Sequence, residues 1–211
     1  MMEIDNFAII GKFLRFPLPK NQFYLIQIIQ RRKDFPEGKL DKNHRMIKSF
    51  YIYSEDELKA SSEFIKDTCR KLNARAYLTL NPRDSEQITL LAIQELARYA
   101  QSNSTKASTS VIDHCIGISG TIGEKLWIVD IDTKDEDYIL QVCKSINFCN
   151  SEFLPIILGR IPTKNGCHLI THPFNMWQFD MLGSFDKADI KRDARTLLFY
   201  GNSENCSNSS E

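Results

Sequence analysis

Two aspartates on one expected strand carry the clearest chemical signal in the sequence. Asp130 lies at the end of the apolar run KLWIVDI (125–131), with Asp132 directly after it, and side chains that alternate along a strand place both on one face. Two carboxylates this close repel each other in a partly buried site unless a cation neutralises them. Their hard oxygen atoms suit Mg²⁺ or Mn²⁺, which typically serve phosphoryl transfer. The alternative is that the aspartates only cap the helix that follows.

A histidine on a later strand adds to this pair. The turn at 162–166 leads into an expected strand at 167–171, with His168 near its start. Lys164 and the backbone N–H groups of the turn could face a phosphate. A single strand histidine is more often structural, and the acidic strand is what makes His168 a candidate catalytic residue.

Basic residues gather in two further places. Residues 31–48 hold seven Lys and Arg against three Asp and Glu, and Arg31 and Arg32 open this stretch, which could follow a nucleic-acid backbone. Arg75, Asn81 and Arg83 flank another expected strand, and Arg83 precedes a helix N-terminus that could cradle a phosphate. In both places the alternative is a solvated charged surface.

The elements that position these residues follow from periodicity and capping. Ser54 and Glu57 form a capping box for a helix expected to end near Asn73, and Asp84 or Ser85 caps the next helix. Thr133 and Glu136 form a second capping box. Expected strands lie at 23–30, 46–53, 75–80, 125–131, within 153–161, and at 167–171 and 196–200. This order predicts an α+β fold with a mixed sheet.

Composition divides the chain and limits its setting. The Ser- and Thr-rich stretch 101–110 separates a unit at 1–101 from one at 111–200, and the polar tail 201–211 is expected to be disordered. Net charge is zero, no apolar run is long enough to span a bilayer, and the N-terminus does not read as a signal peptide. The six cysteines lack Cys-x-x-Cys spacing. We therefore expect a cytoplasmic protein with buried free thiols, without zinc and without a membrane partner.

The motifs LWIVDID (126–132) and NGCH (165–168) resemble the catalytic core of the archaeo-eukaryotic primase superfamily, which includes the primase-polymerases. The resemblance covers residues 120–200. It implies an RRM-like catalytic core with an N-terminal α/β accessory lobe that helps hold template and nucleotide. The whole chain also resembles small proteins of phage genomes, a likeness that implies no activity.

The resemblance also implies roles for individual residues. Asp130 and Asp132 would be metal ligands, and His168 would contact the phosphates of the incoming nucleotide. A third acidic ligand is expected further along the chain, where Asp189 is the first candidate, ahead of Asp193 and Asp180.

Three functions remain open from the sequence. The first is a metal-dependent nucleotidyltransferase of primase-polymerase type, which uses a nucleoside triphosphate and nucleic acid in DNA replication. The second is a catalytically silent module that binds nucleic acid or a replication protein, favoured by the small size and neutral charge. The third is a metal-dependent nuclease or phosphodiesterase, because aspartate pairs with a histidine also serve hydrolysis.

Overall fold

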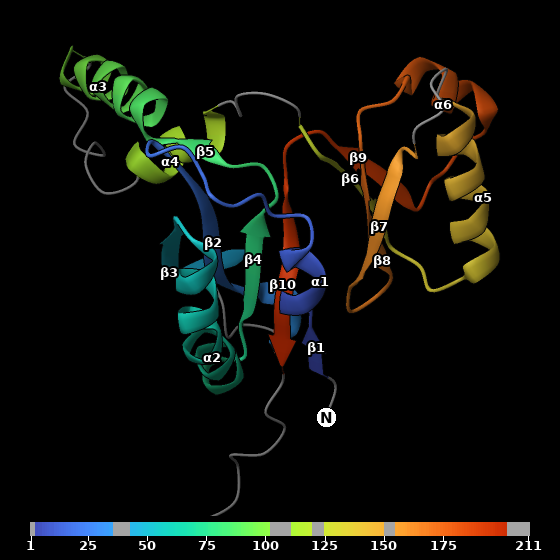
Figure 1. The fold of residues 1–211 in the computed structure, drawn as a ribbon, viewed down its shortest axis with the longest axis horizontal. Coiled ribbons are helices and arrows are strands. Elements are labelled where there is room, and N and C mark those ends of the chain that lie inside the picture. Colours follow the sequence, from blue (N-terminus) through green and yellow to red (C-terminus); the bar gives the residue numbers. More distant parts are fainter. Residues whose placement is uncertain (1–2, 36–42, 102–110, 120–124, 150–154, 202–211) are drawn as a thin grey trace, which may run out of the picture.

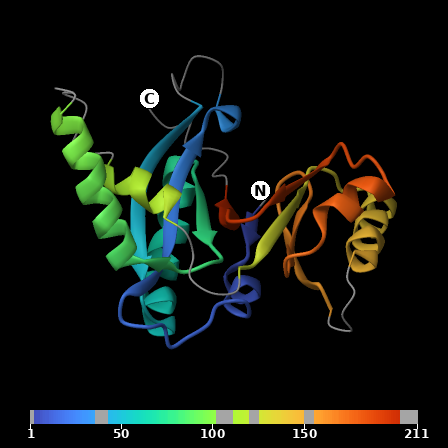
Figure 2. The ribbon, with the colours of Figure 1, turned by 90° about the horizontal axis from the view of Figure 1, so that it is seen from above.

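The computed structural model describes residues 3–35, 43–101, 111–119, 125–149 and 155–201. Within these ranges the strands form two sheets, one in each of two lobes that lie side by side (Figure 1). The view from above separates the same two lobes, with α3 and α5 at opposite ends of the molecule (Figure 2). The predicted linker 101–110 and tail 201–211 lie outside the described residues, apart from Gln101 and Gly201.

The first lobe is built on a six-stranded sheet in the order β1-β10-β4-β2-β3, with β5 paired to β2. Successive side chains of the long strand β2 point to opposite faces of the sheet, and most of them are buried. Both faces of the sheet are therefore covered at its centre. The strands are β1 (Glu3–Asp5), β2 (Gln22–Arg31), β3 (His44–Ile52), β4 (Arg75–Thr79), β5 (Arg83–Asp84) and β10 (Arg195–Gly201).

Helices cover both faces of this sheet. One face packs against α1 (Phe7–Gly11) and α2 (Glu55–Leu72), and the 3₁₀ turn η1 (Arg32–Asp34) follows β2. The hydroxyl of Ser54 accepts a hydrogen bond from the Glu57 N–H at 3.2 Å, and Asn73 ends α2 in the left-handed region, so both predicted helix ends are confirmed. On the other face, α3 (Ser85–Gln101) and α4 (Val111–Ile118) form a small core with β2.

The second lobe has the chain order strand, helix, strand, strand, helix, strand. Its sheet has the order β7-β8-β6-β9. Val129, Ile131 and Leu169 point to one face and pack against the helices, so alternation leaves Asp130 and His168 on the helix-free face. The elements are β6 (Trp127–Ile131), α5 (Glu136–Phe148), β7 (Ile157–Pro162), β8 (Cys167–Thr171), α6 (Met176–Leu182) and β9 (Ala188–Lys191).

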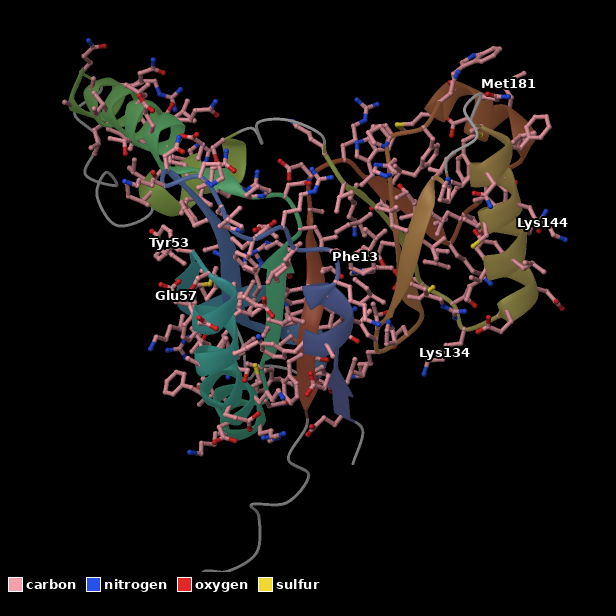
Figure 3. The ribbon with its side chains drawn as sticks, viewed as in Figure 1. Phe13, Tyr53, Glu57, Lys134, Lys144 and Met181 are labelled. Atoms are coloured by element: carbon pink, nitrogen blue, oxygen red, sulfur yellow. The ribbon has the colours of Figure 1, made fainter. Side chains whose placement is uncertain are left out.

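The helix-free face of the second sheet is turned toward the first lobe. Ile128, Ile161 and Ile170 of the second sheet share one core cluster with residues of the first. Figure 3 shows Phe13 between the lobes, where its ring leaves no room for a Cβ at Gly159. Part of this face is therefore buried between the two sheets.

The α+β class is confirmed, and three details of the prediction are corrected. Every strand pairing among the described residues is antiparallel, so the expected mixture of parallel and antiparallel strands is wrong. The predicted last strand of the 111–200 unit is β10, which pairs with β1 and β4 in the first lobe. Helix α4 packs against α3 and belongs to the first lobe as well. The second lobe therefore spans β6 to β9. The sequence did not predict these bounds, because contacts between residues distant in sequence decide which sheet a strand joins.

Two further predictions concern membrane-spanning segments and the state of the cysteines. None of the helices in the described ranges combines the length and hydrophobicity needed to cross a bilayer. The cysteines in these ranges are free thiols, and all but Cys143 are buried, as predicted.

Candidate functional site

Three polar residues lie in register across three strands of the second sheet. Asp130 on β6 pairs with His168 on β8 and with Asp189 on β9. Directly paired residues of antiparallel strands project from the same face, so the three side chains form a row on the helix-free face. The structure thus brings Asp189, the expected third acid, beside the first.

The imidazole of His168 is held from both ring nitrogens. Its Nε2 lies 3.2 Å from Oδ1 of Asp130, and its Nδ1 lies 2.9 Å from the Thr196 hydroxyl. Thr196 belongs to β10 of the first lobe, and His168 is buried. The ring is therefore fixed at the junction of the two sheets, next to a carboxylate.

Lys191 contacts two carboxylates of the site. Its ammonium group lies 2.5 Å from Oδ2 of Asp130 and 3.6 Å from Oδ2 of Asp189. Burial alone would raise the pKa of Asp130, but the hydrogen bonds and charges of His168 and Lys191 outweigh burial and lower that pKa. Burial alone would lower the pKa of Lys191, and contact with Asp130 raises it. Asp130 is thus an anion in contact with two partners, His168 and Lys191.

A basic pocket of about 250 Å³ opens beside this row. Six cationic side chains line it, against the two carboxylates of Asp130 and Asp132. This excess suits an anion with several charges, because charge-assisted hydrogen bonds to phosphate are the strong ones. The cations come from both lobes: Arg31, Lys33, Arg75, Lys164, Lys191 and Arg195.

A buried carboxylate orients two of these cations. Oδ1 and Oδ2 of Asp34 accept hydrogen bonds from Nη2 and Nε of Arg75 at 2.5 and 2.7 Å, and Lys164 donates to Oδ1 at 3.1 Å. Burial would raise the pKa of Asp34, and the two cations lower it. Arg75 belongs to the first lobe and Lys164 to the β7–β8 turn of the second, so Asp34 fixes cations from both sides of the pocket.

A larger groove of about 640 Å³ continues from the pocket across the first sheet. Arg31, Tyr77, Lys191 and Arg195 line both spaces. Arg83, which also lines the groove, donates to Asp193 at 2.6 Å and to the Ser119 carbonyl at 2.9 Å. Its Nε is buried and has no hydrogen-bond partner in the described part of the chain. The groove offers an extended surface with cationic side chains and the ring of Tyr77.

The structure gathers most of the predicted site residues in one place. Asn81 instead has a structural role, since its buried amide binds both backbone groups of Leu126 at 2.8 and 2.9 Å. Arg32 is exposed on η1 and does not line the pocket, and Arg83 lies in the adjoining groove. The predicted residues that line the pocket itself are Asp130, Asp132, His168, Lys164, Arg75 and Arg31.

The sequence prediction missed Asp34, Lys191, Lys33 and Arg195 as parts of this site. Lys33 lies in the basic stretch already singled out, so charge was an available signal for it. Asp34 and Lys191 were missed because their main partners, Arg75 and Asp130, are distant in sequence and become neighbours only in the folded chain.

Three carboxylates at this site suit a divalent cation in their chemistry. Asp130 and Asp189 offer hard oxygen donors from one face of one sheet, and Asp132, which follows β6, lines the same pocket as Asp130. Within the described ranges, however, no three metal-binding side chains come together as a ligand group. The contact of Lys191 with Asp130 and Asp189 shows that these two carboxylates can share one cation.

Comparisons of the chain with protein-family models, with curated proteins and with solved structures found no match.

Proposed function

We propose that this chain is a metal-dependent nucleotidyltransferase of primase-polymerase type, which adds nucleotides from a nucleoside triphosphate to a nucleic-acid strand in DNA replication. The observation that carries the proposal is the row His168–Asp130–Asp189, of which His168 and Asp130 line a pocket with six cationic side chains. Carboxylates beside a polycationic pocket are what a metal-bound triphosphate requires.

The topology of the second lobe supports the same proposal. Its chain order, with two strand–helix–strand halves, is that of the ferredoxin-like folds, among which RRM domains bind nucleic acid with their sheet. The row of polar residues lies on the helix-free face of this sheet. The first lobe then serves as the accessory lobe, which supplies Arg31, Arg75 and Arg195 to the basic pocket.

Each part of the site has a distinct role in this proposal. Asp130, Asp132 and Asp189 would hold Mg²⁺ or Mn²⁺, and such an ion, when bound, stabilises charge on a reacting phosphate. Arg75 and Lys164, both held by Asp34, bind the phosphates of the nucleotide. His168 keeps its Nδ1 contact with Thr196, and its Nε2–H would turn from Asp130 to a phosphate oxygen once that carboxylate binds the ion. The adjoining groove, lined by Arg31, Tyr77 and Arg195, takes the nucleic-acid strand.

Primer extension with labelled nucleoside or deoxynucleoside triphosphates in Mn²⁺ tests the proposal. We expect Asp130→Asn to lose at least about a hundredfold in incorporation, because the charge that binds the cation is removed. The matched control is Asp137→Asn, since Asp137 is exposed on α5 and outside the pocket. Unchanged melting temperatures establish that both variants are folded. Undiminished incorporation by an Asp130→Asn/Asp132→Asn double variant refutes the proposal.

The contact between Lys191 and the two carboxylates favours a second candidate, a catalytically silent module that binds nucleic acid. In this case the ammonium group is the permanent partner of Asp130 and Asp189. Binding of single-stranded DNA or RNA is then unaffected by a chelator, and no nucleotide is incorporated. Fluorescence anisotropy with and without EDTA, run beside the extension assay, separates the two candidates.

A further inference from the structure

Lys191 contacts two of the three carboxylates that would hold the proposed metal ion. It follows Asp189 on β9 by two residues, so both side chains lie on the face that carries Asp130. Its ammonium group is within 2.5 Å of one carboxylate and 3.6 Å of the other. These two carboxylates therefore meet at a single positive charge supplied by the chain.

An ammonium group and a divalent ion cannot both occupy this position. They compete for the same oxygen, Oδ2 of Asp130, and two cations at that separation repel each other. The Lys191 side chain is 38% exposed, so it can leave without disturbing the core. It also lines both the basic pocket and the adjoining groove, where a phosphate can accept its hydrogen bonds.

We propose that Lys191 is a built-in counter-cation that competes with the divalent ion for Asp130 and Asp189, and that it binds the nucleotide phosphates once it is displaced. The inference rests on the proposed function. In the absence of metal, Lys191 prevents repulsion between the carboxylates. With metal and nucleotide bound, it acts as a positioning residue for the triphosphate. The same side chain thus opposes metal binding and supports nucleotide binding.

Substitution by glutamine separates these two effects, because it removes the charge and keeps much of the side-chain length. Lys191→Gln is expected to bind Mn²⁺ roughly tenfold more tightly, since one competing charge-assisted hydrogen bond at a partly exposed site is lost. Its affinity for ATP at saturating Mn²⁺ is expected to fall by a similar factor. A residue that only supports the fold would weaken both.

The experiment is a calorimetric titration of the full chain, first with MnCl₂ and then with ATP at saturating Mn²⁺. Lys144→Gln is the matched control, because Lys144 lies on α5 at the far side of the second lobe and the variant changes net charge equally (Figure 3). Tighter Mn²⁺ binding together with weaker ATP binding supports the inference, and the absence of either change overturns it. Failure of both wild type and variant to bind Mn²⁺ overturns the proposed function and the inference with it.

Discussion

Asp34→Ala is expected to destabilise the protein strongly, because it leaves a buried guanidinium group without its counter-ion. The side chains of Asp34 and Arg75 are 1% and 5% exposed. Arg75 donates to both carboxylate oxygens at 2.5 and 2.7 Å, and Lys164 adds a third donor at 3.1 Å. Removing one partner of a buried pair of this kind costs roughly 3–5 kcal/mol, most of it from the charge left behind.

Differential scanning calorimetry measures this loss. In a chain of this size each kcal/mol lowers Tm by about 2–4 °C, so a fall of roughly 6–20 °C is expected. Glu136→Ala is the control, since Glu136 also makes a bidentate pair with an arginine, Arg160, at 2.7 and 2.8 Å. The side chains of Glu136 and Arg160 are 71% and 41% exposed, so water replaces the lost contact and Tm is expected to change little. Equal shifts for the two variants would show that burial does not set the strength of the Asp34 pair.

Three further outcomes follow from the same contacts. The pKa of Asp34 is lowered in the folded protein, so its contribution to stability is fully present above the unfolded pKa, about 4, and is lost as pH falls through the folded pKa. In urea unfolding, the difference in free energy of unfolding between wild type and Asp34→Asn should therefore be constant above about pH 5 and shrink below about pH 4. Gly166→Ala should lose about 1–3 kcal/mol in urea unfolding, because a Cβ there lies 1.9 Å from the Ile131 carbonyl oxygen, and wild-type stability would contradict this close packing. Asn81→Ala should lose about 2–4 kcal/mol in the same assay, because both backbone groups of Leu126 become unpaired, and a loss below about 0.5 kcal/mol would argue against a junction held by Asn81.

Local features of the fold were predictable from sequence because local interactions determine them. Ser54 and Asn73 bound α2 as expected, and the Asp84 carboxylate caps α3 by accepting from two backbone N–H groups at 2.9 Å. At α5 the predicted capping box is displaced, since Asp135 rather than Thr133 is the N-cap residue. Two capping side chains lie close together there, and periodicity alone does not choose between them.

Long-range features were not predictable from sequence, because contacts between residues distant in the chain determine them. Strand β9 has only four residues, and its alternating pattern becomes a strand because it pairs with β6. The apolar sequence of β10 is typical of a buried strand in either sheet, so it does not predict which lobe the strand joins. Asp130 and His168 were expected to lie together at one pocket, and the strand register confirms that they are neighbours. The contacts of Asp34 with Arg75 and of Lys191 with Asp130 join residues that are distant in sequence.

Strand β10 explains why the candidate site needs both lobes. It follows β9 directly, so the chain passes from Asp189 and Lys191 in one sheet to Thr196 in the other. Thr196 binds His168, while Leu198 and Phe199 lie in the core shared by the two sheets. Any rotation of one lobe against the other would break the hydrogen bond to His168 and disturb buried apolar packing together. The imidazole is therefore positioned by the same strand that joins the lobes, which preorganises this side of the site without a ligand.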